Sequence, residues 1–414
     1  MRKIIASLDL GSNSIKLIVG EIQKSKLNVL ACVDVKSQGI KKGFIVNPES
    51  AMLALKDAFK KAEELVGLPI KKVLVGVPSY NLDCFITEGS VTIKTEDKVI
   101  THDHLIKALQ KSIYKKIDDN RELVSILPTK FIINDDEQVK SPVNMVANKL
   151  TAHAVAVVIP KKNMEAIVKC LEKMNVEVID ICVSPLADFY EFKKTEYNSK
   201  VGVVVNIGQS NTVVSIFNKG ILTSSEIIDL GSSSIDNDIA YVFKIPKTDA
   251  VYLKEQLVVC DIKSALPAEN VTVKDISGEE IKINQYDVSA VAISRIQELL
   301  NLVKKQINLL TKKEISYIII TGGISELTYF NRYLDEMFDG LAQVGETNEI
   351  GARSNKYSTA LGMIKYYNSR LKLRNIDYSI FNSDEEEQLS GNHKKIEFAE
   401  NSLLGKIYGY FFDN

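Results

Sequence analysis

The chain has 414 residues, of which 45% are hydrophobic and 25% charged, a balance typical of soluble domains with sizeable cores. Its net charge of −1 gives no sequence-wide basic field, so nucleic acid is not an expected partner. The five cysteines are scattered without a C-x-x-C pair, and no run approaches the roughly 18 apolar residues of a membrane span. These features argue against a disulfide framework, a zinc site or a spanning helix, and favour the cytoplasm.

The first predicted element is a hairpin over residues 8–19, LDLGSNSIKLIV, in which two apolar strands flank a short polar turn. The pattern returns at residues 205–216, VNIGQSNTVVSI. A turn of this kind can offer a row of backbone N–H groups to a phosphate. Repetition at this separation predicts two similar halves that face each other. Coincidence between two common hairpins is the alternative.

Helices and strands alternate through the rest of the chain, which predicts an α/β fold. Two stretches of more charged strands, 83–159 and 241–308, are predicted to be insertions. After the strand 317–321, Gly322 and Gly323 allow another group to approach the backbone closely. The other predicted elements are helices at 48–65, 102–116, 164–174, 184–192, 286–309 and 327–337, and strands at 72–77, 152–159 and 176–182.

The two hairpins, the turn TGG at 321–323 and the βαβ halves resemble the actin, Hsp70 and sugar-kinase superfamily, and most closely the FtsA family of bacterial cell-division proteins. The resemblance covers roughly residues 4–370. It implies an actin-like α/β fold of two nucleotide-clamping halves, each with an inserted subdomain, then a disordered linker and a C-terminal amphipathic helix. The implied divisions are 1–82, 160–198 and 358–374 for subdomain 1A, 83–159 for 1C, 199–240 and 309–357 for 2A, 241–308 for 2B, 375–400 for the linker and 401–414 for the helix.

The resemblance also implies a site for ATP or ADP between the halves. The expected nucleotide-binding residues are Gly11, Ser12, Asn13, Ser14, Lys16, Gly208, Gln209, Ser210, Asn211, Gly231, Ser232, Gly322, Gly323 and Ile324. A solvated strand residue is the alternative for Lys16.

The second loop departs from the family pattern. Asn206 stands where the family carries Asp, and Gln209 and Ser210 stand where it carries glycine. Asp9 and Asn206 are the expected Mg²⁺ residues, both through water. Because an amide supplies no charge and cannot polarise a water as a carboxylate does, we expect weak metal binding and slow or absent hydrolysis. No catalytic residue is assigned.

An enzyme is the alternative, because residues 9–14, DLGSNS, also resemble the opening of exopolyphosphatases. Those enzymes carry a second loop with several glycines and an acidic residue just beyond it, whereas the loop 208–212 has no acid near. Glu122 is the one loose candidate for the catalytic carboxylate that such an enzyme needs.

The implied partners are the C-terminal peptide of the tubulin-like protein FtsZ, further copies of the chain in an actin-like filament, and a membrane. The peptide is expected on 241–308, at Arg295 and Glu298, because its acidic character suits a guanidinium fork. The inserted subdomain 83–159 is expected to take part in the filament contact.

The last fourteen residues, NSLLGKIYGYFFDN, place their apolar side chains over an arc of roughly 200° on a helical wheel. We expect this helix to bind an anionic membrane surface and to hold the protein at the cytoplasmic face of the cell membrane, at the division site. A tail that docks on its own core is the alternative. The expected membrane-contacting residues are Leu403, Leu404, Lys406, Ile407, Phe411 and Phe412.

Overall fold

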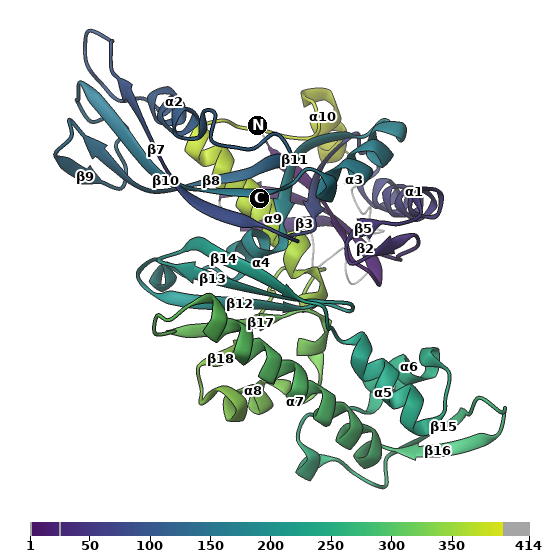
Figure 1. Cartoon of the computed structure of the whole chain (residues 1–414). Coiled ribbons are helices and arrows are strands. Elements are labelled where there is room, and N and C mark those ends of the chain that lie inside the picture. The colour runs from purple at the N-terminus through teal and green to yellow at the C-terminus, as the bar shows by residue number, and fades with distance from the viewer. Residues whose placement is uncertain (1, 25, 392–414) are drawn as a thin grey trace, which may run out of the picture.

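The computed structural model describes residues 2–24 and 26–391, and it is built around two five-stranded sheets (Figure 1). The first sheet has the order β11-β6-β1-β2-β3, with strands at Lys3–Leu10 (β1), Ser14–Gln23 (β2), Lys26–Lys36 (β3), Lys72–Val77 (β6) and Glu177–Val183 (β11). The second has the order β14-β13-β12-β17-β18, with strands at Val201–Ile207 (β12), Thr212–Asn218 (β13), Ile221–Ile228 (β14), Tyr317–Thr321 (β17) and Ala342–Val344 (β18).

The two sheets share one topology. In each sheet, the first three strands in chain order are antiparallel neighbours. The first of these strands also pairs, along its other edge, with a parallel strand, and that strand pairs with a second parallel strand. The central strands β1, β12 and β17 are buried along most of their length, which explains their near-continuous apolar sequences. The predicted repeat of two similar halves is therefore confirmed, and the fold is α/β.

Two helices lie between the sheets, α4 (Ser184–Phe192) and α9 (Ser358–Arg374), as Figure 1 shows. Helix α9 packs on β1, β2 and β6, whereas α4 packs on β12, β13 and β14. The helices approach so closely that a Cβ on Gly362 would lie 1.9 Å from the carbonyl oxygen of Ala187. The α4–α9 contact is thus the joint between the halves.

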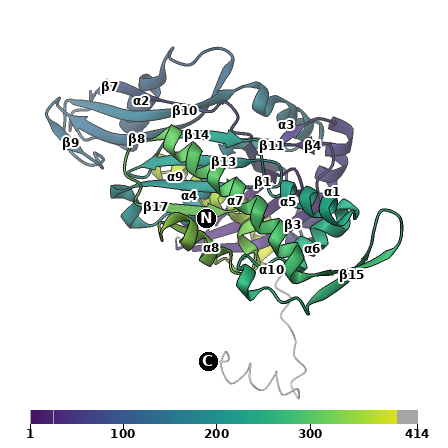
Figure 2. The same cartoon turned by 60° about the horizontal axis from the view of Figure 1, so that its bottom comes forward.

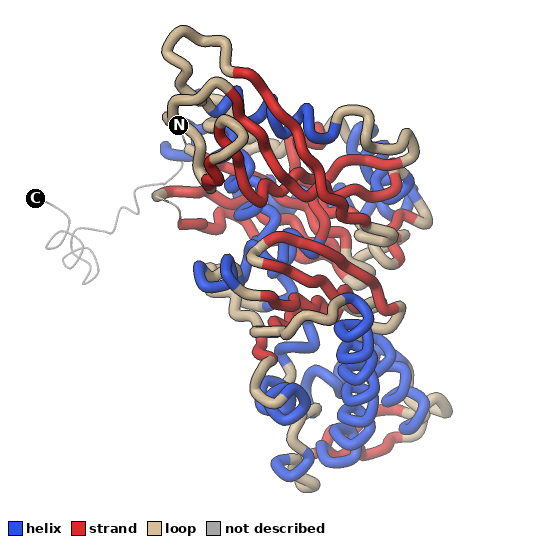
Figure 3. Tube along the Cα trace, turned by 60° about the vertical axis from the view of Figure 1, so that its left-hand side comes forward, coloured by secondary structure: helices blue, strands red, loops and turns tan. Residues whose placement is uncertain are grey.

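Each half carries an insertion, and the two lie at opposite ends of the molecule (Figures 1 and 3). In the first, α2 (His102–Ile113) covers a sheet of order β7-β10-β8-β9, formed by Asp83–Thr92 (β7), Arg121–Ile133 (β8), Glu137–Val139 (β9) and Lys149–Pro160 (β10). The second contains α5 (Ser233–Phe243), α6 (Lys247–Leu257), the hairpin of β15 (Asn270–Lys274) and β16 (Glu280–Asn284), and α7 (Gln285–Leu310), seen best in Figure 2.

The remaining elements lie on the outside of the two halves. They are β4 (Ile40–Lys41), β5 (Phe44–Ile45), α1 (Pro48–Val66), α3 (Lys162–Lys173), α8 (Phe330–Phe338) and α10 (Ser383–Gly391). The predicted helix at 327–337 begins later, at Phe330, because a 3₁₀ turn over Gly323–Glu326 follows β17 first. Within the described ranges, no helix combines the length and apolar character that a membrane crossing requires.

The segment after α9 differs from the predicted linker at 375–400. The backbone N–H of Ile380 donates to the carbonyl oxygen of Ile4 at 2.9 Å, and Ile380 and Phe381 are buried in the core of the first half. Lys3 and Asp377 form an ion pair at 2.5 Å. Residues 375–382 are therefore part of the first half, and α10 follows them. The rest of the predicted linker and the predicted amphipathic helix 401–414 lie outside the described residues.

Candidate nucleotide site

A pocket of about 900 Å³ lies between the two halves and is lined by both hairpin turns. Nearly all of the residues expected to bind nucleotide line it, as do Asp9 and Asn206. The expected residue that does not line the pocket is Gly231, which instead supports the second turn. The lining residues foreseen from the sequence are Gly11, Ser12, Asn13, Ser14, Lys16, Gly208, Gln209, Ser210, Asn211, Ser232, Gly322, Gly323 and Ile324.

The first turn is closed by a hydrogen bond from the backbone N–H of Gly11 to the carbonyl oxygen of Ser14, at 3.1 Å. A Cβ at residue 11 would lie 2.7 Å from that oxygen, so glycine is required there. The hydroxyl of Ser12 accepts from the backbone N–H of Lys42 at 2.8 Å. These contacts fix the first turn against its own half of the molecule.

The second turn has the same closure, from the N–H of Gly208 to the carbonyl oxygen of Asn211 at 2.9 Å. The start of α5 braces it from behind, because Ser232 N–H donates to the Gly208 carbonyl and Ser233 N–H to the Gln209 carbonyl, both at 2.9 Å. A Cβ at Gly231 would lie 2.5 Å from each of those carbonyl oxygens, so only glycine permits this approach.

The two halves touch at the mouth of the pocket. The amide of Gln209 donates to the side-chain oxygen of Asn13 at 3.3 Å, so the two turns are in direct contact. Asp229, just beyond β14, accepts from the Tyr80 hydroxyl at 2.9 Å and forms an ion pair with Lys42 at 2.8 Å. These hydrogen bonds and the Lys42 charge hold the pKa of the Asp229 carboxyl below its ordinary value.

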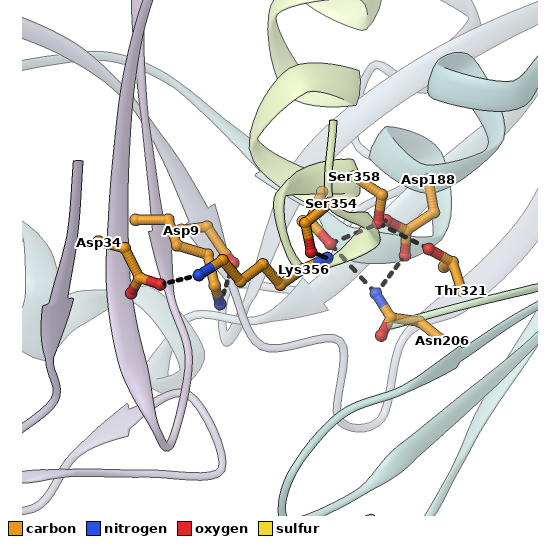
Figure 4. A network of polar contacts seen from close by, with 10 residues as sticks. Asp9, Asp34, Asp188, Asn206, Thr321, Ser354, Lys356 and Ser358 are labelled. Atoms are coloured by element: carbon orange, nitrogen blue, oxygen red, sulfur yellow. Dashed lines mark hydrogen bonds and ion pairs between the residues drawn. The ribbon is translucent and has the colours of Figure 1, made fainter. Parts of the chain in front are cut away.

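At the base of the pocket, Asn206 is bound to a buried carboxylate of helix α4, which lies at the joint between the halves (Figure 4). Its amide donates to Asp188 at 2.7 Å and to the hydroxyl of Thr359 at 3.1 Å. Asp188 also accepts from Thr359 at 2.8 Å and from Ser358 at 3.2 Å. Burial raises the pKa of the Asp188 carboxyl to about 6, although these hydrogen bonds act in the opposite direction.

Asp188 contacts the pocket residue Asn206, and it was not predicted from the sequence. It lies on α4 between Ala187 and Phe189, in a helix whose other side chains are mostly apolar and buried. An acidic residue among buried apolar residues of a helix needs hydrogen-bond partners in the folded protein. This pattern in the sequence could have indicated that Asp188 belongs to a polar site. Its partner Ser358 is 170 positions away, so spacing alone could not reveal the pairing.

The residues present do not fit Mg²⁺ well. Asp9 is paired with Lys16, whose ammonium lies 3.2 Å from the carboxylate, and Asn206 directs its amide N–H groups to Asp188 and Thr359. Over the part of the chain that the structure describes, no group of three or more His, Cys, Asp or Glu side chains is placed to hold a metal ion. A divalent cation prefers several oxygen ligands, with carboxylates among them.

Arg295 and Glu298 lie on α7, away from the pocket. The Arg295 guanidinium donates to both carboxylate oxygens of Asp238, at 2.5 and 2.9 Å, and to Glu298 at 2.5 Å. Arg295 was expected to bind an acidic peptide through its guanidinium, whereas two carboxylates of the chain, Asp238 and Glu298, already engage that group. A shallow groove of about 410 Å³ runs along the same face of α7, lined by Ser294, Gln297, Glu298, Asn301, Leu302 and Lys305.

Comparison with known families matches two parts of the chain. Residues 203–362 match the family model described as cell division protein FtsA, and residues 80–158 match the model described as the SHS2 domain inserted in FtsA. The two matches together cover more than half of the chain, including the second turn and nearly all of the first insertion. The chain belongs to the FtsA family.

Relatives extend the likeness over most of the length. The chain is 26% identical to cell division protein FtsA of Bacillus subtilis, over 91% of this chain and 87% of the relative. It is 25% identical to FtsA of Enterococcus hirae, over 87% and 82%.

Solved structures show the fold alone, because their sequence identities are low. MreB5 of Spiroplasma citri bound to ADP has a TM-score of 0.56 at 14% identity, over 89% of this chain and 98% of that one. The PilM–PilN type IV pilus biogenesis complex matches with a TM-score of 0.56 at 13% identity, over 87% and 97%. The predicted actin-like fold is therefore confirmed.

Proposed function

We propose that the chain is an actin-like cell-division protein that binds ATP, polymerises, and tethers FtsZ filaments to the cytoplasmic face of the cell membrane at the division site. The observation that carries the proposal is the pair of glycine turns facing each other across one pocket, in a chain of the FtsA family. Backbone N–H groups of two opposed turns suit a polyphosphate, which would join the two halves.

The proposed site binds nucleotide and hydrolyses it slowly or not at all. Attack by water needs a group that can take its proton, and the acids at the loops are engaged: Asp9 by Lys16, and Asp188 by Asn206. Nothing favours the exopolyphosphatase alternative, and Glu122 lies on β8 in the first insertion. Phosphate release from ATP and from polyphosphate tests both statements, with boiled protein as the blank. Rapid release from either substrate would contradict the proposal.

The FtsZ peptide is proposed to bind on α7, along the groove beside Arg295 and its partners Asp238 and Glu298. Since Asp238 and Glu298 neutralise the guanidinium, an acidic peptide would have to share it with them. Arg295→Glu would leave three acids together, so we expect at least a tenfold loss of peptide affinity in a fluorescence titration. Arg332→Glu is the matched control, because Arg332 is paired with Asp261 at 3.1 Å outside the groove. Equal affinity for the two variants would remove Arg295 from the site.

The membrane contact is proposed for the amphipathic segment 401–414, outside the described residues. An isolated segment of this length binds weakly, and a filament that presents many copies binds firmly. Removing residues 401–414 should abolish sedimentation with anionic liposomes while leaving the circular dichroism spectrum and the thermal midpoint unchanged. Undiminished sedimentation of the truncated chain would place the contact elsewhere.

Self-assembly is proposed to use the first insertion, as a heterologous contact that does not close. Ile86 on β7 is 82% exposed, which makes it a useful probe of that surface. Pelleting of Ile86→Lys and of the unaltered chain, on lipid with ATP, tests the contact: the variant should pellet less. Equal pelleting would exclude the exposed face of β7.

A further inference from the structure

The cationic groups of the nucleotide pocket are lysines that the chain itself supplies. Lys16 lies over the first turn, since its ammonium would be 3.0 Å from a Cβ placed on Gly11. Its side chain is only 13% exposed, and it forms an ion pair with Asp9 at 3.2 Å. An ammonium at this place carries three donors, enough to keep Asp9 and still bind a phosphate oxygen.

Two further aspartates of the pocket are also paired with lysines. Asp34 pairs with Lys356 at 2.8 Å (Figure 4), and Asp236 pairs with Lys254 at 2.6 Å. All four of these side chains line the pocket. A divalent ion bound by Asp9 would therefore have to displace Lys16, and one bound by Asp34 or Asp236 would have to displace another lysine.

Asn206 cannot supply the missing charge. Its amide is held by Asp188 and Thr359, so its two N–H groups point into the joint between the halves. Asp188 is in turn 1% exposed, and its oxygens accept from Asn206, Thr359 and Ser358. The second turn thus carries an amide at residue 206, and the nearest carboxylate it contacts is Asp188 in the buried joint.

We propose that this pocket binds a nucleoside polyphosphate without Mg²⁺, with the Lys16 ammonium in the role that the divalent cation plays in related sites. The inference rests on the proposed nucleotide function and adds that binding needs no divalent cation. The fraction of protein that holds nucleotide should therefore not depend on the free Mg²⁺ concentration.

The experiment is calorimetric titration of the full chain with sodium ATP, once in excess EDTA and once in excess Mg²⁺. We expect dissociation constants that agree within about threefold. Lys16→Gln should weaken binding in EDTA by about tenfold or more, because a charge-assisted contact to phosphate is lost, and Mg²⁺ should recover part of that loss. Lys61→Gln is the control for the removal of a lysine charge, since Lys61 pairs with Asp57 on the exposed side of α1.

Exchanging the acid and the amide between residues 188 and 206 tests whether the position of the carboxylate decides the Mg²⁺ requirement, because the number of carboxylates stays the same. Asp188→Asn combined with Asn206→Asp returns the charge to the second turn. This double variant should acquire a preference for Mg²⁺ of about tenfold, with a circular dichroism spectrum that shows it folded.

The outcomes separate the two claims. ATP binding by the unaltered chain in Mg²⁺ but not in EDTA would overturn the inference and leave the nucleotide function standing. Absence of binding under both conditions would refute the nucleotide function, and the inference with it. A Lys16→Gln variant that binds as well as the unaltered chain in EDTA would also overturn the inference.

Discussion

Replacing Asp188 by Asn should change how the stability of the protein depends on pH. The carboxyl pKa is raised by burial from 3.8 to about 6, so the folded protein binds this proton more tightly than the unfolded chain does. The group therefore stabilises the fold when protonated, and that contribution is lost as pH rises through about 6. The rise from 3.8 to about 6 corresponds to roughly 3 kcal/mol in total, of which about half should be present at pH 5.

The assay is urea unfolding of both proteins followed by circular dichroism at pH 5 and pH 7.5. The free energy of unfolding of Asp188→Asn, minus that of the unaltered chain, should be lower at pH 5 than at pH 7.5 by about 1–2 kcal/mol. Asp229→Asn is the control. Because the Asp229 pKa is lowered, its contribution is lost only as pH falls below the ordinary carboxyl range, and its difference should stay constant over this interval. A constant difference for Asp188→Asn as well would refute the buried, partnered carboxylate at the joint.

Three further variants test the joint, the mouth of the pocket and the segment after α9. Gly362→Ala should lower the free energy of unfolding by about 1–3 kcal/mol, because its Cβ would meet the Ala187 carbonyl; an increase from better helix propensity would show that α4 and α9 are farther apart. Tyr80→Phe removes the hydroxyl that contacts Asn211 and Asp229, so amide hydrogen exchange in residues 208–211 should rise severalfold, and unchanged exchange would argue against a closed mouth. Phe381→Ala should cost about 3–5 kcal/mol, whereas a linker residue would cost less than about 0.5 kcal/mol.

Local patterns predicted the regular elements well. Helix α4 has the predicted bounds, Ser184–Phe192, and α7 differs from its predicted range by one residue at each end. Both hairpins form where two apolar strands around a glycine turn predicted them. These features depend on neighbours in the sequence, so the sequence could report them.

Contacts between distant segments could not be predicted in this way. The sequence showed that Asn206 stands where an acid is expected. Its pairing with Asp188 depends on the packing of α4 against β12, which spacing in the sequence does not indicate. The same holds for Arg295, whose partner Asp238 lies 57 positions away on α5. Composition alone was misleading after Arg374, because a few apolar side chains in a polar stretch, Tyr378, Ile380 and Phe381, pack against the core.

Recruitment of FtsZ filaments to a membrane would show whether the chain acts as the proposed tether. Fluorescent FtsZ, polymerised with GTP, would be added to a supported bilayer containing anionic lipid, with the full chain and ATP. We expect filaments on the bilayer with the unaltered chain, and a loss of filaments when residues 401–414 are removed or Arg295→Glu is introduced. Filaments that remain in solution with the unaltered, folded and ATP-bound chain would contradict the proposed tether.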